Sequence, residues 1–424
     1  MGSLEGQRVT VMGLGRFGGG LGVTRWLGAQ GADVLVTDTA DETKLAESVG
    51  KLRDLVHRGS VSLRLGEHNV SDFTNADLVI ANPAVPKPWD NRYLRAAQAA
   101  NVRITTEIGL VIERLPNPKR VIGVTGSLGK STTAAMTARA IESTGQPIVL
   151  GGNIGGSLLD RLDEITNDTW VVLELSSAML HWLDGWSPSI AIVTNFSENH
   201  LDWHGSVEHY RASKQKLLAS QQPGDAAVID EPLDWPTNDS VRRIDVPRGA
   251  RIDGLSIPGT HNARNAAFAL AVCQAVGLDE DRALSGLRAF EGLPHRLRFI
   301  GERDGVRYFD DSKSSTPGAT LLAVESFDDR SRIHLIAGGY DKGLDLSPIS
   351  DLAQALGGLY TIGSTGKSIA DASGGVGVYC ETLDRAVSLA RERAKTGDVV
   401  LLSPGCASWD QFEHFEARGQ RFAQ

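Results

Sequence analysis

The sequence is poor in cysteine, and it has no cluster of basic residues. Its three cysteines, Cys273, Cys380 and Cys406, are far apart and lack the Cys/His spacing of a zinc site. This usage predicts a reduced protein of the cytoplasm. The net charge is −9 and no run of lysine or arginine stands out, which argues against a nucleic-acid partner.

Long apolar runs are also missing. No stretch approaches the length of a membrane span, and residues 1–6 have neither the basic nor the apolar region of a signal peptide. We therefore expect no membrane-spanning segment. The 424 residues are too many for one hydrophobic core and predict two or three domains, and the 47 glycines suit an α/β protein with many tight strand–helix turns.

The most informative stretch runs from Val121 to Thr133 and is typical of a strand, a glycine turn and the start of a helix. Gly126 and Gly129 would let backbone N–H groups approach phosphate oxygens, and Lys130 would add a positive charge. The strict phosphate-loop pattern has a glycine six residues before the lysine, where this chain has Val124. The stretch is therefore a variant of the pattern, and an ordinary strand–helix turn is the alternative interpretation.

A second glycine turn, with glycines at 13, 15 and 18, lies between predicted strands at Arg8–Met12 and Ala32–Asp38. The spacing, with an acidic residue ending the second strand, is typical of a dinucleotide-binding unit. This signal is weak by itself, since the same turn suits other phosphate or uridine-type ligands. An NAD-dependent oxidoreductase therefore stays open as an alternative.

Charged residues follow two further predicted strands. Glu174 lies near the end of the apolar run Trp170–Leu175, where a buried carboxylate needs a partner such as Mg²⁺, unless it caps a local turn. After the strand Ile190–Val193, the group His200, Asp202 and His204 has the residue types of a hydrolase metal site or of a solvated surface group.

The last third of the chain again alternates strands and helices, which predicts a parallel α/β unit. Its expected strands are Arg307–Asp310, Ile333–Ala337, Leu359–Ile362 and Val399–Leu402. The third of them precedes a second Gly-Lys-Ser loop at residues 363–368. We favour the first loop as the phosphate site, because only that loop is followed by a strand with a lone carboxylate and by the His200 segment.

Several motifs occur in the order found in Mur ligases, a family of ATP-dependent amide ligases that this chain resembles from end to end. They include Thr125-Gly-x-x-Gly-Lys-Ser131, Asn153-Ile-Gly, Glu174-Leu-Ser-Ser, His200-Leu-Asp-x-His-Gly, Tyr210-Arg-x-x-Lys214, Leu293-Pro-His-Arg296, Asp310-Asp-Ser-Lys313 and Ser408-Trp-Asp-Gln-Phe412. The resemblance implies an α/β protein of three domains. These are a Rossmann-like UDP-sugar domain (1–107), a central P-loop-type ATPase domain with a mostly parallel sheet (108–297), and a Rossmann-like C-terminal domain (298–424) that closes on the nucleotide and binds the amino acid.

The resemblance also implies binding residues, grouped here by ligand. For ATP they are Gly126, Ser127, Gly129, Lys130, Ser131, Thr132, Asn262, Asn265, Arg296 and Asp311. For the UDP-sugar they are Gly15, Asp38, Thr39 and Asn153, and for the amino acid Lys313, Ser315, Lys342, Ser408 and Phe415. Two Mg²⁺ ions would be held by Ser131, Glu174, His200 and a CO₂-derived carbamate on Lys214. Lys130, His200 and Lys214 would be the catalytic residues.

The implied reaction joins D-glutamate to UDP-N-acetylmuramoyl-L-alanine through an acyl phosphate, as in peptidoglycan precursor synthesis. We expect a monomer that acts on these small molecules. A sibling ligase for L-glutamate or another amino acid and an inactive nucleotide-binding scaffold are the remaining alternatives. Departures from the family pattern are Leu128 for an asparagine in the phosphate loop, and Asn82 and Ala84 in a loop that is usually Ser-Pro-Gly.

Overall fold

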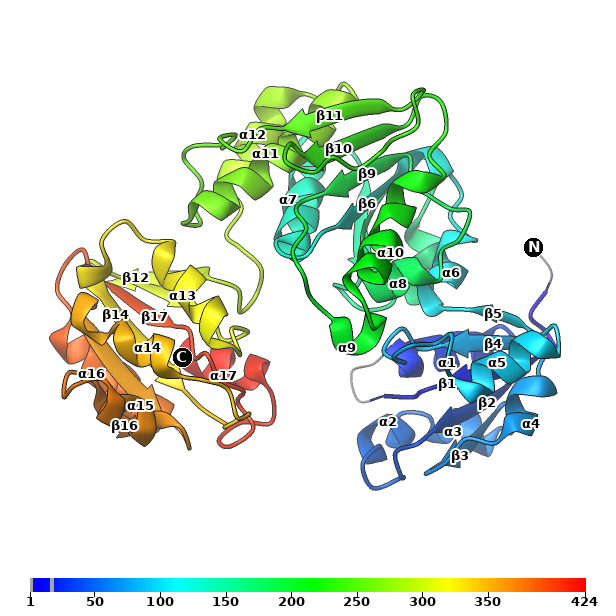
Figure 1. The fold of residues 1–424 in the computed structure, drawn as a ribbon, viewed down its shortest axis with the longest axis horizontal. Coiled ribbons are helices and arrows are strands. Elements are labelled where there is room, and N and C mark those ends of the chain that lie inside the picture. Colours follow the sequence, from blue (N-terminus) through cyan, green and yellow to red (C-terminus); the bar gives the residue numbers. More distant parts are fainter. Residues whose placement is uncertain (1–2, 16–18) are drawn as a thin grey trace. The chain divides into compact units, whose positions relative to one another are not determined.

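The computed structural model describes residues 3–15 and 19–424 (Figure 1). Close contacts divide the chain into two compact units. The first comprises residues 1–248 with 268–283, and the second comprises 249–267 with 284–424. The described residues form three β-sheets, two in the first unit and one in the second. The boundaries at residues 107 and 297 stay a prediction, although the changes from one sheet to the next fall near them.

The N-terminal sheet has the strand order β3-β2-β1-β4-β5, with all pairs parallel. Its elements are β1 (Arg8–Met12), α1 (Gly19–Ala29), β2 (Asp33–Asp38), α2 (Ala46–Gly50), α3 (Arg53–His57), β3 (Val61–Leu65), α4 (Val70–Thr74), β4 (Leu78–Ala81), α5 (Arg92–Ala99), β5 (Arg103–Thr105) and α6 (Glu107–Ile112). The chain adds β2 and β3 on one side of β1 and then adds β4 and β5 on the other side. The glycine turn after β1 therefore lies at the switch point where such sheets bind ligands. Gly18 of the expected motif lies outside the described residues.

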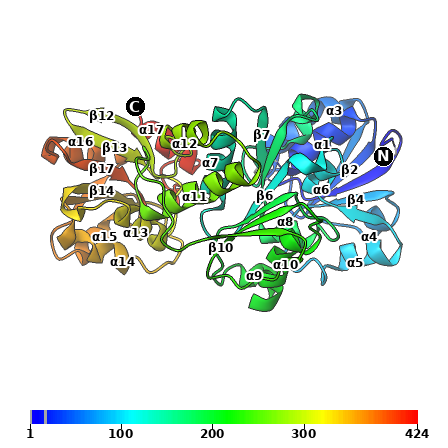
Figure 2. The same ribbon diagram turned by 90° about the horizontal axis from the view of Figure 1, so that it is seen from above.

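The middle sheet has the order β11-β10-β9-β6-β8-β7, again with all pairs parallel. Its elements are the 3₁₀ helix η1 (Pro118–Arg120), β6 (Val121–Thr125), α7 (Lys130–Ser143), β7 (Ile148–Gly152), η2 (Leu159–Glu164), β8 (Trp170–Glu174), α8 (Ser177–His181), β9 (Ile190–Val193), α9 (Leu201–His204), α10 (Val207–Ala219), β10 (Ala226–Asp230), β11 (Arg242–Val246), α11 (Thr260–Ala275) and α12 (Glu280–Arg288). Figure 2 shows α7 on one face of this sheet, and α8 and α10 on the other.

The C-terminal sheet has the order β12-β13-β17-β14-β15-β16. Its elements are β12 (Arg298–Arg303), β13 (Val306–Asp310), α13 (Pro317–Glu325), η3 (Arg330–Arg332), β14 (Ile333–Gly338), α14 (Ser347–Asp351), η4 (Ala353–Ala355), β15 (Gly358–Ile362), α15 (Gly366–Ala372), β16 (Val378–Glu381), α16 (Leu383–Arg393), β17 (Val399–Leu402) and α17 (Phe415–Phe422). The four expected strands, β13, β14, β15 and β17, pair in parallel as predicted, and the additional strand β12 pairs antiparallel with β13. The two strands form a hairpin around Asp304 and Gly305, both of which have positive φ.

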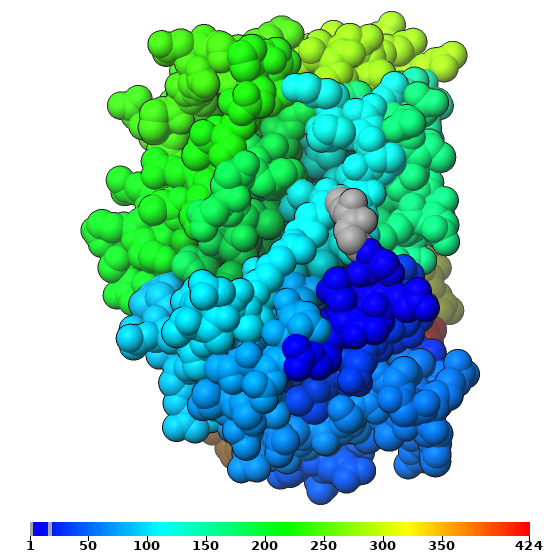
Figure 3. All heavy atoms as spheres, turned by 90° about the vertical axis from the view of Figure 1, so that its right-hand side faces the viewer, coloured from blue at the N-terminus to red at the C-terminus, as the bar shows by residue number. Residues whose placement is uncertain are grey.

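The central strands of the sheets are runs of valine, isoleucine and leucine, and they are buried on both faces. All five residues of β6 and of β8 are buried, as expected for central parallel strands. The chain passes from the N-terminal to the middle sheet through α6 and η1, in the cyan region of Figure 3. No helix in the described part of the chain combines the length and hydrophobicity required to cross a bilayer.

One glycine of α1 permits close packing of that helix on the turn after β1. A Cβ at Gly20 would collide with the carbonyl oxygens of Gly13 and Leu14, whereas one at Gly19 would meet no atom within 4 Å. We expect Gly20→Ala to lower the free energy of unfolding by about 2 kcal/mol or more. Gly19→Ala, one residue away, should be neutral or slightly stabilising, because alanine favours a helix more than glycine does. Urea unfolding of the two variants checks this, and equal stabilities would contradict it.

Candidate active site

The phosphate loop follows β6, and its shape requires two glycines. Gly126 and Gly129 have φ values of 149° and 78°, which side chains rarely adopt, and a Cβ at Gly126 would collide with Thr194 Oγ1. Gly129 is the residue before α7, whose first turn leaves N–H groups without acceptors inside the helix. The loop and helix together therefore have the geometry that binds phosphate.

Two residues at the end of β9 hold this loop, and the sequence had given them no role. Asn195 Oδ1 accepts from the backbone N–H groups of Ser127 and Leu128 at 3.1 and 2.8 Å. Thr194 Oγ1 donates to Leu128 O at 2.7 Å. The side chain of Leu128 is 57% exposed. Although Leu128 replaces the family's asparagine, Thr194 and Asn195 still hold the backbone of the phosphate loop against the end of β9.

The side chains of the loop point in different directions. Lys130 Nζ donates to Ser127 O at 2.9 Å. Ser127 Oγ lies 2.8 Å from Ser197 O and 3.0 Å from the Tyr210 hydroxyl, so this side chain joins the loop to α10. Ser131 and Thr132 are partly exposed in the first turn of α7.

Lys214 is a buried amine that lies against the phosphate loop. Its side chain comes from α10 and is 1% exposed, and Nζ donates to Gly126 O at 2.7 Å. Nζ also lies 4.8 Å from the centre of the Tyr210 ring. Burial, together with the charge of Lys130, lowers the pKa of Lys214 to about 6, against a smaller opposing effect of Glu174. A lysine on a helix is usually solvated, whereas Lys214 is buried, and its amine is largely neutral at pH 7.

Glu174 ends β8 beside this amine and is 1% exposed. Its Oε1 accepts from Asn153 Nδ2 at 3.1 Å, whereas its buried Oε2 has no hydrogen-bond partner. A carboxylate oxygen buried without a partner costs free energy unless a cation is bound there. The donor set of Glu174 and the hydroxyl of Ser131 consists of oxygen atoms, which suits Mg²⁺.

The group His200, Asp202 and His204 lines the cavity described below but forms no metal site of its own. His200 is exposed and in the left-handed region, with φ 53°. Partial desolvation of its ring, with the charges of Lys130 and Lys214, lowers its pKa. His204 is buried instead, with Nε2 2.9 Å from Ser177 Oγ and Nδ1 2.8 Å from His209 Nδ1. Nowhere in residues 3–15 and 19–424 do three His, Cys, Asp or Glu side chains gather as a metal site. The hydrolase-type metal centre is therefore not formed by these residues.

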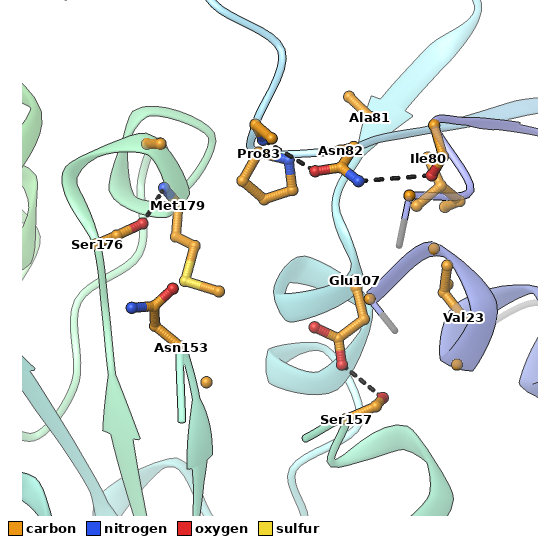
Figure 4. A pocket seen from close by; sticks show the side chains of 18 of the residues that line it. Val23, Ile80, Ala81, Asn82, Pro83, Glu107, Asn153, Ser157, Ser176 and Met179 are labelled. Atoms are coloured by element: carbon orange, nitrogen blue, oxygen red, sulfur yellow. Dashed lines mark hydrogen bonds between the residues drawn. The ribbon is translucent and has the colours of Figure 1, made fainter. Parts of the chain in front are cut away.

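A cavity of about 940 Å³ opens between the carboxyl ends of the N-terminal and middle sheets (Figure 4). Five residues predicted from the sequence line it, namely Gly15, Lys130, Asn153, His200 and Lys214. Its size and its mixture of glycine backbone and polar side chains suit a large polar ligand. Asp38 is not among the residues that line the cavity. Its carboxylate accepts from the N–H groups of Gly15 and Ala40 at 3.2 and 2.8 Å. Thr39 is exposed next to it.

Other residues of the cavity wall were not found from the sequence. Asn82 Oδ1 accepts from Ala84 N at 2.9 Å, so the asparagine closes the turn that a serine would close in the usual Ser-Pro-Gly loop. Glu107 accepts from Ser157 Oγ at 2.6 Å, and burial and Asp160 raise its pKa. Dashed lines in Figure 4 mark both hydrogen bonds.

In the second unit, the residues expected near ATP are mostly buried. Asn262 and Asn265 are 5% and 7% exposed, and Asn262 Nδ2 donates to Pro258 O at 2.7 Å. The carboxylate of Asp311 accepts from Ser314, Ser403 and the N–H of Leu297, and burial raises its pKa to about 6. Arg296 lies between His295 and Leu297, two non-glycine residues with positive φ. The structure thus fixes this loop tightly to β13.

The residues expected at the amino acid occupy three loops of the second unit. Lys313 Nζ lies 5.0 Å from the Phe415 ring centre, and Lys342 Nζ lies 5.1 Å from the Trp409 ring centre, next to the buried Ser408. Ser315 is partly exposed two residues beyond Lys313. The two ammonium groups are positioned by aromatic faces.

Arg418, which the sequence analysis missed, joins these loops. It is 1% exposed, and its guanidinium donates to Ser312 Oγ and O, Cys406 O and Ala407 O at 2.8–3.2 Å. Tyr340 N donates to the same Ala407 O at 2.8 Å. Burial lowers the pKa of Arg418 to about 10. Only the folded chain reveals this role, since Arg418 lies 106 residues from Ser312 in the sequence.

The second Gly-Lys-Ser loop differs from the first. Lys367 is exposed and pairs with Asp371 at 2.8 Å, and Ser364 N donates to Asp410 Oδ2 at 2.8 Å. A carboxylate thus lies where a phosphate would bind, and the helix that follows, α15, has only 7 residues. These contacts support the preference for the first loop.

Comparison with known proteins agrees with this geometry. Residues 7–106 match the Mur ligase MurD-like N-terminal domain, 124–246 the Mur ligase middle domain, and 295–406 the Mur ligase glutamate ligase domain. Two relatives, from Roseiflexus sp. (strain RS-1) and Pelotomaculum thermopropionicum, are 36% and 35% identical, and the alignments cover 99% of this chain and 98% and 97% of the relatives. Both are named UDP-N-acetylmuramoylalanine--D-glutamate ligase.

Solved structures show the same fold at lower identity. The UDP-N-acetylmuramate-alanine ligase MurC from Thermotoga maritima has a TM-score of 0.59 at 21% identity, with 98% of both chains covered. The MurF ligase from the same organism, in complex with ADP, has a TM-score of 0.56 at 16% identity, covering 99% of this chain and 93% of that one.

Fold and phosphate loop define a multi-sheet α/β protein of the nucleotide-binding class. The domain matches and the full-length relatives show that the chain belongs to the Mur ligase family of ATP-dependent ligases. The N-terminal match includes the turn after β1, so the nicotinamide interpretation of that turn has no support.

The low pKa of Lys214 predicts a pH dependence of stability. Its folded pKa of about 6 lies below the ordinary 10.5, so between these values the unfolded chain binds a proton that the folded chain does not. The free energy of unfolding should therefore rise with pH in this window, and Lys214→Met should raise it near pH 7 and flatten the rise toward about pH 9. Urea unfolding in CO₂-depleted buffer measures this. Lys216→Met, which removes an ammonium paired with Asp184, is the control, and an unchanged slope in Lys214→Met would contradict the prediction.

Proposed function

We propose that this chain joins D-glutamate to UDP-N-acetylmuramoyl-L-alanine at the cost of ATP, in the synthesis of peptidoglycan precursors. The observation that carries the proposal is the similarity, over nearly the whole length of both chains, to relatives named for that reaction. Three features have chemistry that suits these substrates. They are the phosphate loop, the cavity beside it, and Lys313 and Lys342 of the second unit. We further propose a cytoplasmic monomer.

ATP phosphates are assigned to the loop after β6. Backbone N–H groups of the first turn of α7 would face the phosphate oxygens, and Lys130 would spread the charge that develops on the transferred group. Gly126 and Gly129 allow the close approach. Asn262, Asn265, Arg296 and Asp311 are assigned to the rest of the nucleotide on family resemblance.

Two Mg²⁺ ions are assigned to Ser131, Glu174, His200 and Lys214. The partnerless Oε2 of Glu174 and the oxygen chemistry of Ser131 support this assignment. When bound, Mg²⁺ would neutralise negative charge on the phosphate oxygens and help to orient them. In the protein itself, Asn153 orients the carboxylate through its 3.1 Å hydrogen bond.

Lys214 is assigned a carbamate. A neutral amine carries the lone pair needed to attack the carbon of CO₂, and the nitrogen then loses a proton to leave a carbamate anion. The lowered pKa of Lys214 provides the neutral amine at pH 7. The product would replace a largely neutral amine with a carbamate that carries one negative charge over two oxygens, which suits the neighbouring cations.

The reaction itself follows from the chemistry of the substrates. The L-alanyl carboxylate attacks the γ-phosphorus of ATP, ADP leaves, and an acyl phosphate results. The amino group of glutamate, once deprotonated, attacks the acyl carbon, and phosphate leaves as the amide forms. The protein's part is to hold the reacting groups in line and away from water, with Gly15, Asp38, Thr39 and Asn153 on the UDP-sugar.

The amino acid is assigned to the loops joined by Arg418. Glutamate has two carboxylates, and Lys313 and Lys342 offer two separate ammonium groups for them. Ser315 and Ser408 add hydroxyl groups, and Phe415 shapes the side of the site. A sibling ligase for L-glutamate would use the same groups with a different stereochemical preference.

Phosphate release from ATP tests the proposal. We expect release only when Mg²⁺, UDP-N-acetylmuramoyl-L-alanine and D-glutamate are all present. Lys130→Ala should reduce the rate by at least about 100-fold, because a charge at the phosphates is lost. Lys367→Ala, at the equivalent position of the second loop, should stay within about twofold because it removes only an exposed ion pair.

The alternatives predict other results. Release with L-glutamate in place of D-glutamate would identify a sibling ligase. An equal loss in Lys130→Ala and Lys367→Ala would contradict the choice of loop. No release in any combination would reject the ligase and favour an inactive scaffold.

A further inference from the structure

Trp89, in the segment that leads away from the Asn82 loop, packs against three helices of the middle sheet. Its ring centre lies 4.2 Å from that of His209 on α10, 5.5 Å from that of His181 on α8, and 5.9 Å from that of Trp203 on α9. An aromatic side chain from the N-terminal sheet thus contacts all three helices on one face of the middle sheet. Nothing in the sequence motifs explains this residue.

Trp203 binds the same segment through two hydrogen bonds. Its indole Nε1 donates to Pro83 O at 3.0 Å, and its own carbonyl accepts from Lys87 N at 3.2 Å. Lys87 has φ 44°, a conformation that costs free energy in a lysine and is held here by these contacts. The position of α9 is therefore tied to the segment from Asn82 to Trp89.

The helix α9 has little independent stability. It has four residues, begins after His200 with φ 53° and ends at Gly205 with φ 73°. A single turn of this kind gains few hydrogen bonds of its own, so packing decides where it lies. His200, which immediately precedes α9, takes its position from this packing.

The rings around Trp89 form a neutral cluster. Burial, with smaller effects of Lys216 and His209, lowers the pKa of His181 to about 4. Burial, with smaller effects of His209, His181 and His200, lowers the pKa of His204 to about 3. The contact therefore does not depend on charge near pH 7. It depends on the shape of the rings and on the hydrogen bonds of Trp203.

Residues of the Asn82 loop and of the segment from His200 to His204 both line the cavity. Asn82, Pro83 and Ala84 line it, and so do His200, Trp203 and His204. A ligand that contacts the first group would restrain the segment on which Trp89 is carried. That restraint would reach α9 through the Trp89 and Trp203 contacts.

We propose that Trp89 is a positioning residue, through which the Asn82 loop, when it binds the UDP-sugar, fixes α9 and thereby places His200 at the phosphate site. The inference rests on the proposed function, because it uses the UDP-sugar as the ligand of the cavity. It assigns to Trp89 no contact with substrate.

Hydrogen–deuterium exchange of the full chain, with and without UDP-N-acetylmuramoyl-L-alanine, tests the coupling. The amides of Trp203, His204 and Gly205 report on α9, since they donate to His200 O and Leu201 O. The amide of Gly13, which donates to Thr37 O, reports on the ligand itself. In the unaltered protein, the ligand should slow exchange at both places, by about tenfold at α9.

Two substitutions and a control separate coupling from general damage. Trp89→Ala should retain the slowing at Gly13 and lose it at α9, and Trp89→Phe should restore most of it, because a ring remains. In turnover, Trp89→Ala should lower kcat about tenfold while KM for the UDP-sugar changes less than about threefold. Trp170→Phe, at the amino end of β8, should leave both readouts unchanged.

Slowing at α9 in Trp89→Ala equal to that in the unaltered protein would overturn the inference while leaving the proposed function intact. Slowing at neither place in the unaltered protein would reject the UDP-sugar as ligand, and the inference with it. A rise in KM with unchanged kcat would also overturn it, since that result would place Trp89 in binding rather than in positioning.

Discussion

Lys214 Nζ lies 2.7 Å from the carbonyl oxygen of Gly126, and this hydrogen bond fixes a buried amine of α10 to the loop after β6. Its burial requires the rest of the site to be built closely around it, with Tyr210 on one side and the phosphate loop on the other. The same burial, with the charge of Lys130, keeps the amine from holding a proton at pH 7. A neutral lysine next to a phosphate loop has the lone pair that the proposed carbamate requires.

Strand order explains why the other groups gather at this point. β6 lies between β8 and β9, and all three run parallel, so their carboxyl ends meet at one edge. The phosphate loop follows the first, Glu174 ends the second, and Thr194 with Asn195 follows the third. Because the N-terminal sheet also presents its carboxyl edge to the cavity, one hollow collects groups from two sheets.

The sequence predicted the parts of the fold whose strands are buried and continuous. β9 and β17 were predicted to the residue, and β8 to within one residue, because a buried parallel strand is an unbroken apolar run. β3, β7, β11, β12 and β16 were missed, and all of them lie at sheet edges, where strands such as Arg242–Val246 carry exposed or charged residues. The inner strand β10 was also missed, although all five of its residues are buried. The alternation of strands and helices predicts parallel strands, so it gave no indication of the antiparallel strand β12.

For the site, patterns near the loop were sufficient to find Lys130, Glu174 and His200 as candidates. The roles of Asn195, Trp89 and Arg418 could not be predicted, because each acts through contacts with residues far away in the chain. Lys214 shows the same limit, since a lysine on a helix is usually solvated, and only its burial reveals otherwise. Ligand assignments for the second unit came from family resemblance.

Transfer of labelled oxygen tests the central claim, that the site activates a carboxylate with the γ-phosphate of ATP. UDP-N-acetylmuramoyl-L-alanine labelled with ¹⁸O in its carboxylate is turned over with ATP and D-glutamate, and the released phosphate is analysed by mass spectrometry. The account predicts that the phosphate carries one labelled oxygen from the carboxylate. Phosphate without label, released as fast as the amide forms, would contradict it.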